Sequence, residues 1–208
     1  DYQDIYTEGI SKITAEDMKY AAGLEMKIKL LATSKRKGDK FSAMVCPTLV
    51  GKDSPLYSVD GVFNAIFIHG NVLGDAMFYG RGAGEMPTAS AIVGDVFDIV
   101  RNILFDCTGR ISCTCYRETP VKNFKEVKNK FYIRMLVDNK PGVLAAIASV
   151  FGVHKVSIAR VIQKTEADDA AELVIVTEAV KEKHLEDALE HLADMDTTRE
   201  IGTVIREY

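Results

Sequence analysis

Two short stretches of this 208-residue sequence have the residue types and spacing from which a binding site can be built. The first is Gly-Arg-Gly-Ala-Gly at 80–84, followed by Pro87 and Thr88, between an expected strand and an expected helix. Glycines at such a junction allow close approach of a ligand to the backbone, because they carry no side chain. The second is Asp-Asn-Lys-Pro-Gly at 138–142, which also precedes an expected helix.

The glycine run does not form a dinucleotide-binding fingerprint. That motif needs Gly-x-Gly-x-x-Gly, and although Gly80 and Gly82 fit, Glu85 occupies the third position. A carboxylate there would repel a pyrophosphate, and no acidic residue follows at the expected place in a βαβ unit. A nucleotide-binding Rossmann core is therefore not predicted for this chain. Whether the glycines serve a ligand or only a turn with positive φ stays open at this point.

The turn at 138–142 suits a free amino acid. Asp138 can hold an ammonium group, Asn139 can both donate and accept hydrogen bonds, and the first N–H groups of the helix after Gly142 can bind a carboxylate. The same residues are also good turn formers, so a purely structural or dimerising role is the alternative.

The remaining reactive residues form no constellation. The cysteines match no common zinc spacing, and we expect buried free thiols. The histidines are scattered, and the acids of the long helix lack a partner base, so neither a metal site nor a catalytic residue is predicted. These residues are Cys46, Cys107, Cys113, Cys115, His69, His154, His184, His191, Asp95, Asp98 and Asp106.

Hydrophobic periodicity predicts the elements of the first half. A helix spans 14–24 behind a capping box in which Thr14 precedes Asp17, and strands follow at 26–30 and 41–50, where Pro47 favours an edge position or a bulge. Helical spacing runs from Val59 to Ile66, a strand occupies 73–79, and a helix covers 88–105. The inward positions expected for that last helix are Ile92, Val96, Ile99, Val100 and Ile103.

The second half has a different pattern, reached through a polar linker at 116–127. Its expected elements follow the ferredoxin-like order β-α-β-β-α-β. They are a strand at 131–137, a helix at 143–152, strands at 156–164 and 171–178, a helical face formed by Leu185, Ala188, Leu189 and Leu192, and a strand at 203–206. We therefore expect an α+β protein: a mixed sheet covered by helices over 1–115, then a small sandwich over 128–208.

Charge and hydropathy exclude several classes of function. The formal net charge of −4 comes from interspersed acids and bases, so nucleic-acid binding is not predicted. No apolar run approaches the roughly 18 residues that span a bilayer, and the first residues do not resemble a secretion signal. We expect no membrane partner and a cytoplasmic location. Because the sequence opens without Met directly into a strand-like segment, we also expect it to be part of a longer protein.

Four blocks in register resemble the homoserine dehydrogenase family. They are Glu-Gly-Ile at 8–10 and the segments 28–32, 59–66 and 79–91, the last of which contains the glycine run. The resemblance implies an NAD(P)-dependent enzyme that interconverts aspartate 4-semialdehyde and homoserine, a step toward threonine, methionine and isoleucine. It also implies that Gly84 approaches the nicotinamide end of the cofactor, with Gly82 and Thr88 nearby. Asn64 and Glu8 match family positions too, but we interpret them as structural residues that hold turns between elements.

The parts of that family that perform chemistry would lie upstream of residue 1. They are the hydride-transfer lysine, the acidic substrate ligands and the Rossmann domain. This chain alone is therefore expected to be inactive and to bind no cofactor, and NAD(P) belongs to the full-length enzyme.

The segments 137–144 and 156–159 resemble ACT domains, which sense amino acids. That resemblance implies an effector site formed by Asp138, Asn139 and Gly142 together with Ser157 and Ile158 from the second strand of a partner domain. Pathway logic suggests threonine as the effector. Because ACT sheets leave an exposed edge and a helix face, we expect a homodimer or higher homo-oligomer. Two alternatives stay open: a non-catalytic amino-acid-sensing dimer, and a scaffold that only sets the oligomeric state.

Overall fold

The protein, seen here as a computed structural model, is described over residues 2–107, 113, 119–167 and 169–208 and divides into two compact units. One unit combines residues 1–51 with 119–208, and the other spans 52–118. The predicted α+β class is confirmed. The first unit contains an eight-stranded mixed sheet, and the second contains a two-stranded sheet followed by a long helix.

The N-terminal part of the first unit contains one helix and a long hairpin. Thr14 caps the helix: its hydroxyl accepts from the Asp17 N–H at 3.3 Å, and the Asp17 carboxylate accepts from the Thr14 N–H at 2.9 Å, as the capping box predicted. The elements are η1 (Tyr2–Asp4), β1 (Tyr6–Thr7), α1 (Ala15–Gly23), β2 (Met26–Lys37) and β3 (Lys40–Gly51).

The C-terminal part of the first unit has the predicted β-α-β-β-α-β order, with one short strand added before its second helix. Its elements are η3 (Phe124–Glu126), β6 (Lys128–Asp138), α3 (Val143–Val153), β7 (Ile158–Ala167), β8 (Ala170–Thr177), β9 (Val180–Lys181), α4 (Glu182–Ala193) and β10 (Thr198–Glu207). Every strand and helix expected over 131–206 is present, although the last strand, predicted at 203–206, begins five residues earlier at Thr198.

The two parts share one sheet, whose strands lie in the order β1-β3-β10-β6-β8-β7, with β2 paired to β3. The joint is the parallel pairing of β10 with β3, where Arg206 lies opposite Thr48. The prediction of an edge or bulge at Pro47 is wrong, because β3 has neighbours on both sides and its register with β2 runs unbroken. Pro47 instead lies where the neighbour of β3 changes from β1 to β10.

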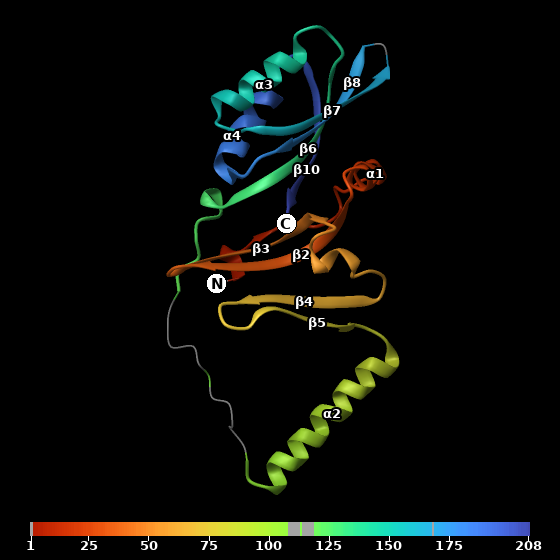
Figure 1. Ribbon diagram of the computed structural model, residues 1–208, viewed down its shortest axis with the longest axis vertical. Coiled ribbons are helices and arrows are strands. Elements are labelled where there is room, and N and C mark those ends of the chain that lie inside the picture. Colours follow the sequence, from red (N-terminus) through yellow and green to blue (C-terminus); the bar gives the residue numbers. More distant parts are fainter. Residues whose placement is uncertain (1, 108–112, 114–118, 168) are drawn as a thin grey trace. The chain divides into compact units, whose positions relative to one another are not determined.

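Helices cover both faces of this sheet (Figure 1). On one face α3 and α4 enclose the main core, in which alternate residues of β6 such as Phe131, Ile133 and Met135 are completely buried. On the other face α1 packs through Ala21 against Tyr132, which also comes from β6. The alternation of side chains along β6 thus places its odd-numbered residues toward α3 and α4 and its even-numbered residues toward α1.

The second unit contains η2 (Pro55–Ser58), β4 (Phe63–Gly70), β5 (Gly74–Arg81) and α2 (Glu85–Leu104). The helix predicted from Val59 to Ile66 is wrong, because β4 pairs in antiparallel register with β5. Short apolar runs fit both periods, and the nearby Gly70–Gly74 turn decides for a hairpin. The strand predicted at 73–79 is confirmed as β5.

Helix α2 begins three residues before its predicted start, and its expected inward positions are not buried. Ile92, Val96, Ile99, Val100 and Ile103 are between 45% and 68% exposed, because no described element of the 52–118 unit covers them. Among the helices of the described ranges, none combines the length and apolarity needed to cross a membrane.

Candidate functional site

The turn after β6 is held by a cluster of ion pairs. The Asp138 carboxylate accepts from Lys140 Nζ at 2.6 Å and from Arg199 Nε at 2.8 Å, and both hydrogen bonds lower the pKa of that carboxyl. Arg199 also donates to the backbone carbonyl and the carboxylate of Asp169, at 2.8 and 2.9 Å. Asp138 therefore already has two cationic partners, and an ammonium ligand would have to compete with them.

Asn139 and Gly142 flank the start of α3. The Asn139 N–H donates to the Asp169 carbonyl at 3.0 Å, whereas its half-buried side-chain amide makes no hydrogen bond to another described residue. Gly142 is the N-cap and is left-handed, with φ of 89°. An amide with unused donors and acceptors beside a helix N-terminus remains compatible with binding of a carboxylate.

Ser157 and Ile158 lie at the other end of the same sheet. Ile158 begins the edge strand β7 and pairs with Thr177, whereas Asp138 ends β6 opposite Ala170. Seven residues of β8 separate those two partners, a distance of roughly 23 Å at about 3.3 Å per residue. One chain therefore does not bring the five predicted effector residues together, and a joint site requires a second copy.

The glycine turn lies on the surface of the 52–118 unit. Gly84 is the N-cap of α2 with φ of 130°, a backbone conformation that side chains rarely permit, and Thr88 in the first turn is exposed. A Cβ atom on Gly82 would overlap the side-chain amide of Asn64 on β4. Both glycines thus have a local structural requirement, and the position of Asn64 against Gly82 agrees with the structural role that we predicted for it.

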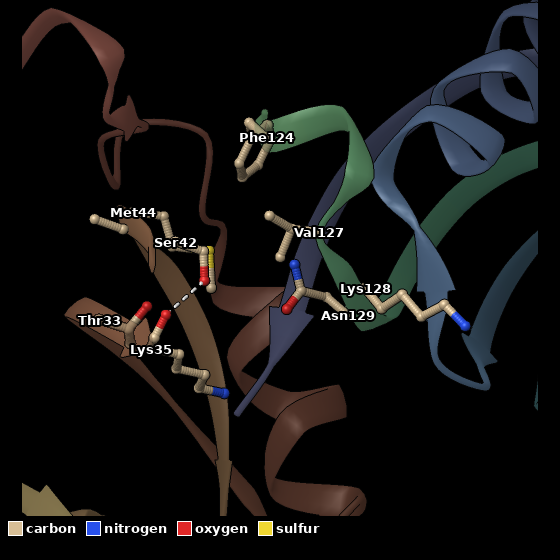
Figure 2. A pocket seen from close by; sticks show the side chains of 9 residues that line it. Thr33, Lys35, Ser42, Met44, Phe124, Val127, Lys128 and Asn129 are labelled. Atoms are coloured by element: carbon tan, nitrogen blue, oxygen red, sulfur yellow. Dashed lines mark hydrogen bonds between the residues drawn. The ribbon is translucent and has the colours of Figure 1, made fainter. Parts of the chain in front are cut away.

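The cavity beside the β2–β3 hairpin is too small for an amino acid. Thr33, Lys35, Ser42 and Met44 face the segment 124–129 across it, and Ser42 donates to the Lys35 carbonyl at 3.4 Å (Figure 2). Its volume is about 40 Å³. That is room for one or two water molecules, whereas small-molecule sites are typically about 300–1,000 Å³.

A groove of about 480 Å³ runs between α4 and the segments that carry Tyr6 and Phe124. Arg206 anchors it: the guanidinium donates to both oxygens of Glu182 at 2.8 and 2.9 Å and to Glu8 at 3.1 Å. Burial disfavours the charged form of Arg206, but the bonds to Glu182 outweigh it and raise its pKa. The guanidinium also lies 4.4 Å from the Tyr6 ring, which stacks on Phe124 at 4.0 Å.

A second ion network ties α1 to the sheet. Arg134 donates to Asp17 at 2.6 Å and to Glu172 at 3.0 Å. Asp17 is fully buried and also accepts from Thr14, Tyr132 and Thr203. Burial raises the pKa of Asp17, but the hydrogen bonds from Arg134 and Thr14 exceed that effect and lower the pKa overall.

Sequence reasoning missed both networks. The available signal was a charged residue directly beside apolar residues within a strand: Arg134 in β6, Glu172 in β8 and Arg206 in β10. A charge at a buried strand position needs a partner, but the sequence does not reveal which one. Glu8, expected to be structural, is one of those partners.

The described residues contain no group of three potential metal ligands. Cys46 is a buried free thiol, as expected, and burial raises its pKa. Cys107 and Cys113 are exposed, so the expectation of buried thiols is wrong for these two, and Cys115 lies outside the described residues.

Residues 1–97 match the homoserine dehydrogenase family, and residues 131–196 match the ACT domain family. A homoserine dehydrogenase of Synechocystis is 39% identical over 213 residues, an alignment that covers 98% of this chain and 49% of the relative. One of Bacillus subtilis is 33% identical over 208 residues, covering 99% of this chain and 48% of the relative.

The crystal structure of a homoserine dehydrogenase from Thiobacillus denitrificans matches the whole chain with a TM-score of 0.88 at 31% identity, over 48% of its own length. The chain thus spans about half the length of the relatives it matches. Together with the βαββαβ fold of its C-terminal part, these matches show that the chain belongs to the homoserine dehydrogenase family and carries an ACT domain.

Proposed function

We propose that this chain is the C-terminal portion of an NAD(P)-dependent homoserine dehydrogenase, which interconverts aspartate 4-semialdehyde and homoserine on the way to threonine, methionine and isoleucine. The observation that carries the proposal is the shared sheet. The segment that matches the homoserine dehydrogenase family supplies β3, which pairs directly with β10. β10 is the last strand of the βαββαβ part and follows the segment that matches the ACT family. The direct pairing of these strands supports the proposal that the ACT domain regulates the enzyme, because the two parts share one sheet.

The proposed contribution to the cofactor site is limited to the glycine turn. Gly84 and Thr88 are exposed at the start of α2, so the nicotinamide end of NAD(P) can approach them. Gly82 supports this turn by leaving room for Asn64. When bound, the cofactor supplies the hydride chemistry, and the residues of this chain only shape one wall of its site.

The chain alone is proposed to be inactive. An assay of homoserine oxidation with NAD⁺ and NADP⁺ should give no rate above the buffer control for the 208-residue chain. The matched experiment uses a full-length relative with Ala at the position of Gly84: KM for the cofactor should rise while the far-UV circular dichroism stays unchanged. Turnover by the isolated chain would refute the proposal that its catalytic groups lie elsewhere.

We further propose that the ACT domain binds an amino acid, threonine in the first instance, between two copies of the chain. Asn139 and Gly142 of one copy would meet Ser157 and Ile158 of the other, because a single copy holds these pairs at opposite ends of its sheet. Homodimerisation is part of this proposal, and the exposed edge strand β7 supports it.

Calorimetric titration with threonine tests this site, with methionine, isoleucine and homoserine as comparators. Asn139→Ala should weaken binding by about 1–3 kcal/mol, the cost of one or two lost hydrogen bonds. Asn71→Ala, in the turn between β4 and β5, is the matched control and should bind like the parent chain. Equal affinities of the Asn139 variant and the parent would remove Asn139 from the pocket, and no heat with any ligand would argue for an assembly role.

A further inference from the structure

Two histidines at one end of the ACT helices take part in neither proposed site. His154 caps the C-terminus of α3, and His191 lies in the last turn of α4. His154 Nε2 and His191 Nδ1 are 3.3 Å apart, and the two rings meet edge to face with their planes at 82°. Within the described ranges, neither imidazole has a further side-chain hydrogen bond.

The separation of these nitrogens suits two ligands of one metal ion. Imidazole nitrogens bind zinc at about 2.0–2.1 Å, so two of them at a tetrahedral angle lie about 3.3 Å apart. In the metal-free chain the same separation lets one imidazole N–H donate to the other ring nitrogen, so a bound cation would replace that hydrogen bond. We propose that His154 and His191 form a two-histidine site for a transition-metal cation that favours imidazole, such as Zn²⁺, Ni²⁺ or Cu²⁺.

The surroundings of the pair favour a cation. Both residues lie at helix C-termini, where unpaired carbonyl groups carry partial negative charge. His191 is exposed and His154 half-buried, so an ion can enter from solvent and water can complete its coordination.

Packing of the hydrophobic core, and not a bound ion, sets the distance between the two histidine rings. Phe151, three residues before His154, and Leu192, next to His191, are both completely buried in the main core cluster. These anchors hold the two helix ends in place. Bound metal therefore adds a link between the ends of α3 and α4 without creating the fold, and affinity should be modest because the chain supplies two ligands instead of three or four.

The test is a Zn²⁺ titration of the 208-residue chain, followed by calorimetry and by the visible absorption of Cu²⁺. Thiolates compete for these metals, so the background carries Ser at 107, 113 and 115 in place of Cys. His154→Ala and His191→Ala are the site variants. His184→Ala, on the same helix, and His69→Ala, whose ring pairs with Asp75 at 2.6 Å, are matched controls.

The background protein should bind about one Zn²⁺ per chain, and each site variant should lose at least tenfold in affinity, while both controls keep it. The thermal midpoint should rise with Zn²⁺ only in the proteins that bind it. Absence of binding in the background protein overturns the proposal, as does loss of binding in only one site variant or equal loss in the His184 control. Far-UV circular dichroism checks folding, and His191→Gln replaces the Ala variant if that one unfolds.

Discussion

Replacing Arg134 with Met should destabilise the first unit more than any surface substitution. The guanidinium is the cation for two carboxylates, Asp17 with none of its side chain exposed and Glu172 with 10% exposed. Met preserves most of the volume but leaves both charges without a cation. Removing one partner of a buried ion pair typically costs about 3–5 kcal/mol. Hydrogen bonds from Thr14 and Thr203 to Asp17 remain, so we expect a loss within that range and not above it.

Urea unfolding at pH 7, followed by circular dichroism at 222 nm, measures this loss. With an m-value of about 2 kcal/mol/M, the midpoint should fall by about 1.5–2.5 M. Lys19→Met breaks an exposed ion pair with Glu16 on α1 and should leave the midpoint unchanged. Adding Asp17→Asn and Glu172→Gln to Arg134→Met removes the stranded charges and should recover part of the loss. A loss below about 1 kcal/mol for Arg134→Met would refute the view that this network ties α1 to the sheet.

Three further predictions concern the same unit. Because the pKa of Asp17 is lowered in the folded state, the ionised Asp17 carboxylate should stabilise the fold above about pH 4, and this stabilisation should be lost as pH falls further. The Asp17→Asn variant should therefore show a shallower acid unfolding curve than the parent chain, and identical curves would contradict this. Arg206→Met should cost about 3–5 kcal/mol in urea unfolding, because Glu182 stays buried without its cation, whereas Lys125→Met at the rim of the same groove should have little effect. Cys46 should react with a thiol reagent far more slowly than the exposed Cys107, since burial both shields it and raises its pKa; equal rates in the native chain would disprove its burial.

The ACT portion could be predicted almost completely from the sequence. Its strands are apolar runs bounded by strong turn formers such as Pro141 and Gly142, and its second helix has one clean apolar face, so local preference and global fold agree. The hairpin at 63–81 was predicted only in part. Val59, Val62 and Ile66 fit helical spacing, and only pairing with β5, which short-range periodicity does not encode, identifies the segment as a strand.

Helix α2 illustrates a different limit. Its apolar spacing predicted a helix correctly, because that spacing is a property of the sequence alone. The same spacing does not predict which other element, if any, packs against the apolar face. In the described part of the 52–118 unit, no element packs over it.

By itself, the sequence determined the α+β class, the family resemblance, the capping of α1 and the residue types at both candidate turns, because these depend on local spacing and on side-chain chemistry. Tertiary structure alone decided that Arg134 meets Asp17, 117 residues away in the chain, and that Arg206 bridges Glu182 and Glu8. It also decided that Asp138 and Ser157 lie at opposite ends of one sheet. Such contacts follow from strand order and register, which many distant pairings set together and which no short segment specifies.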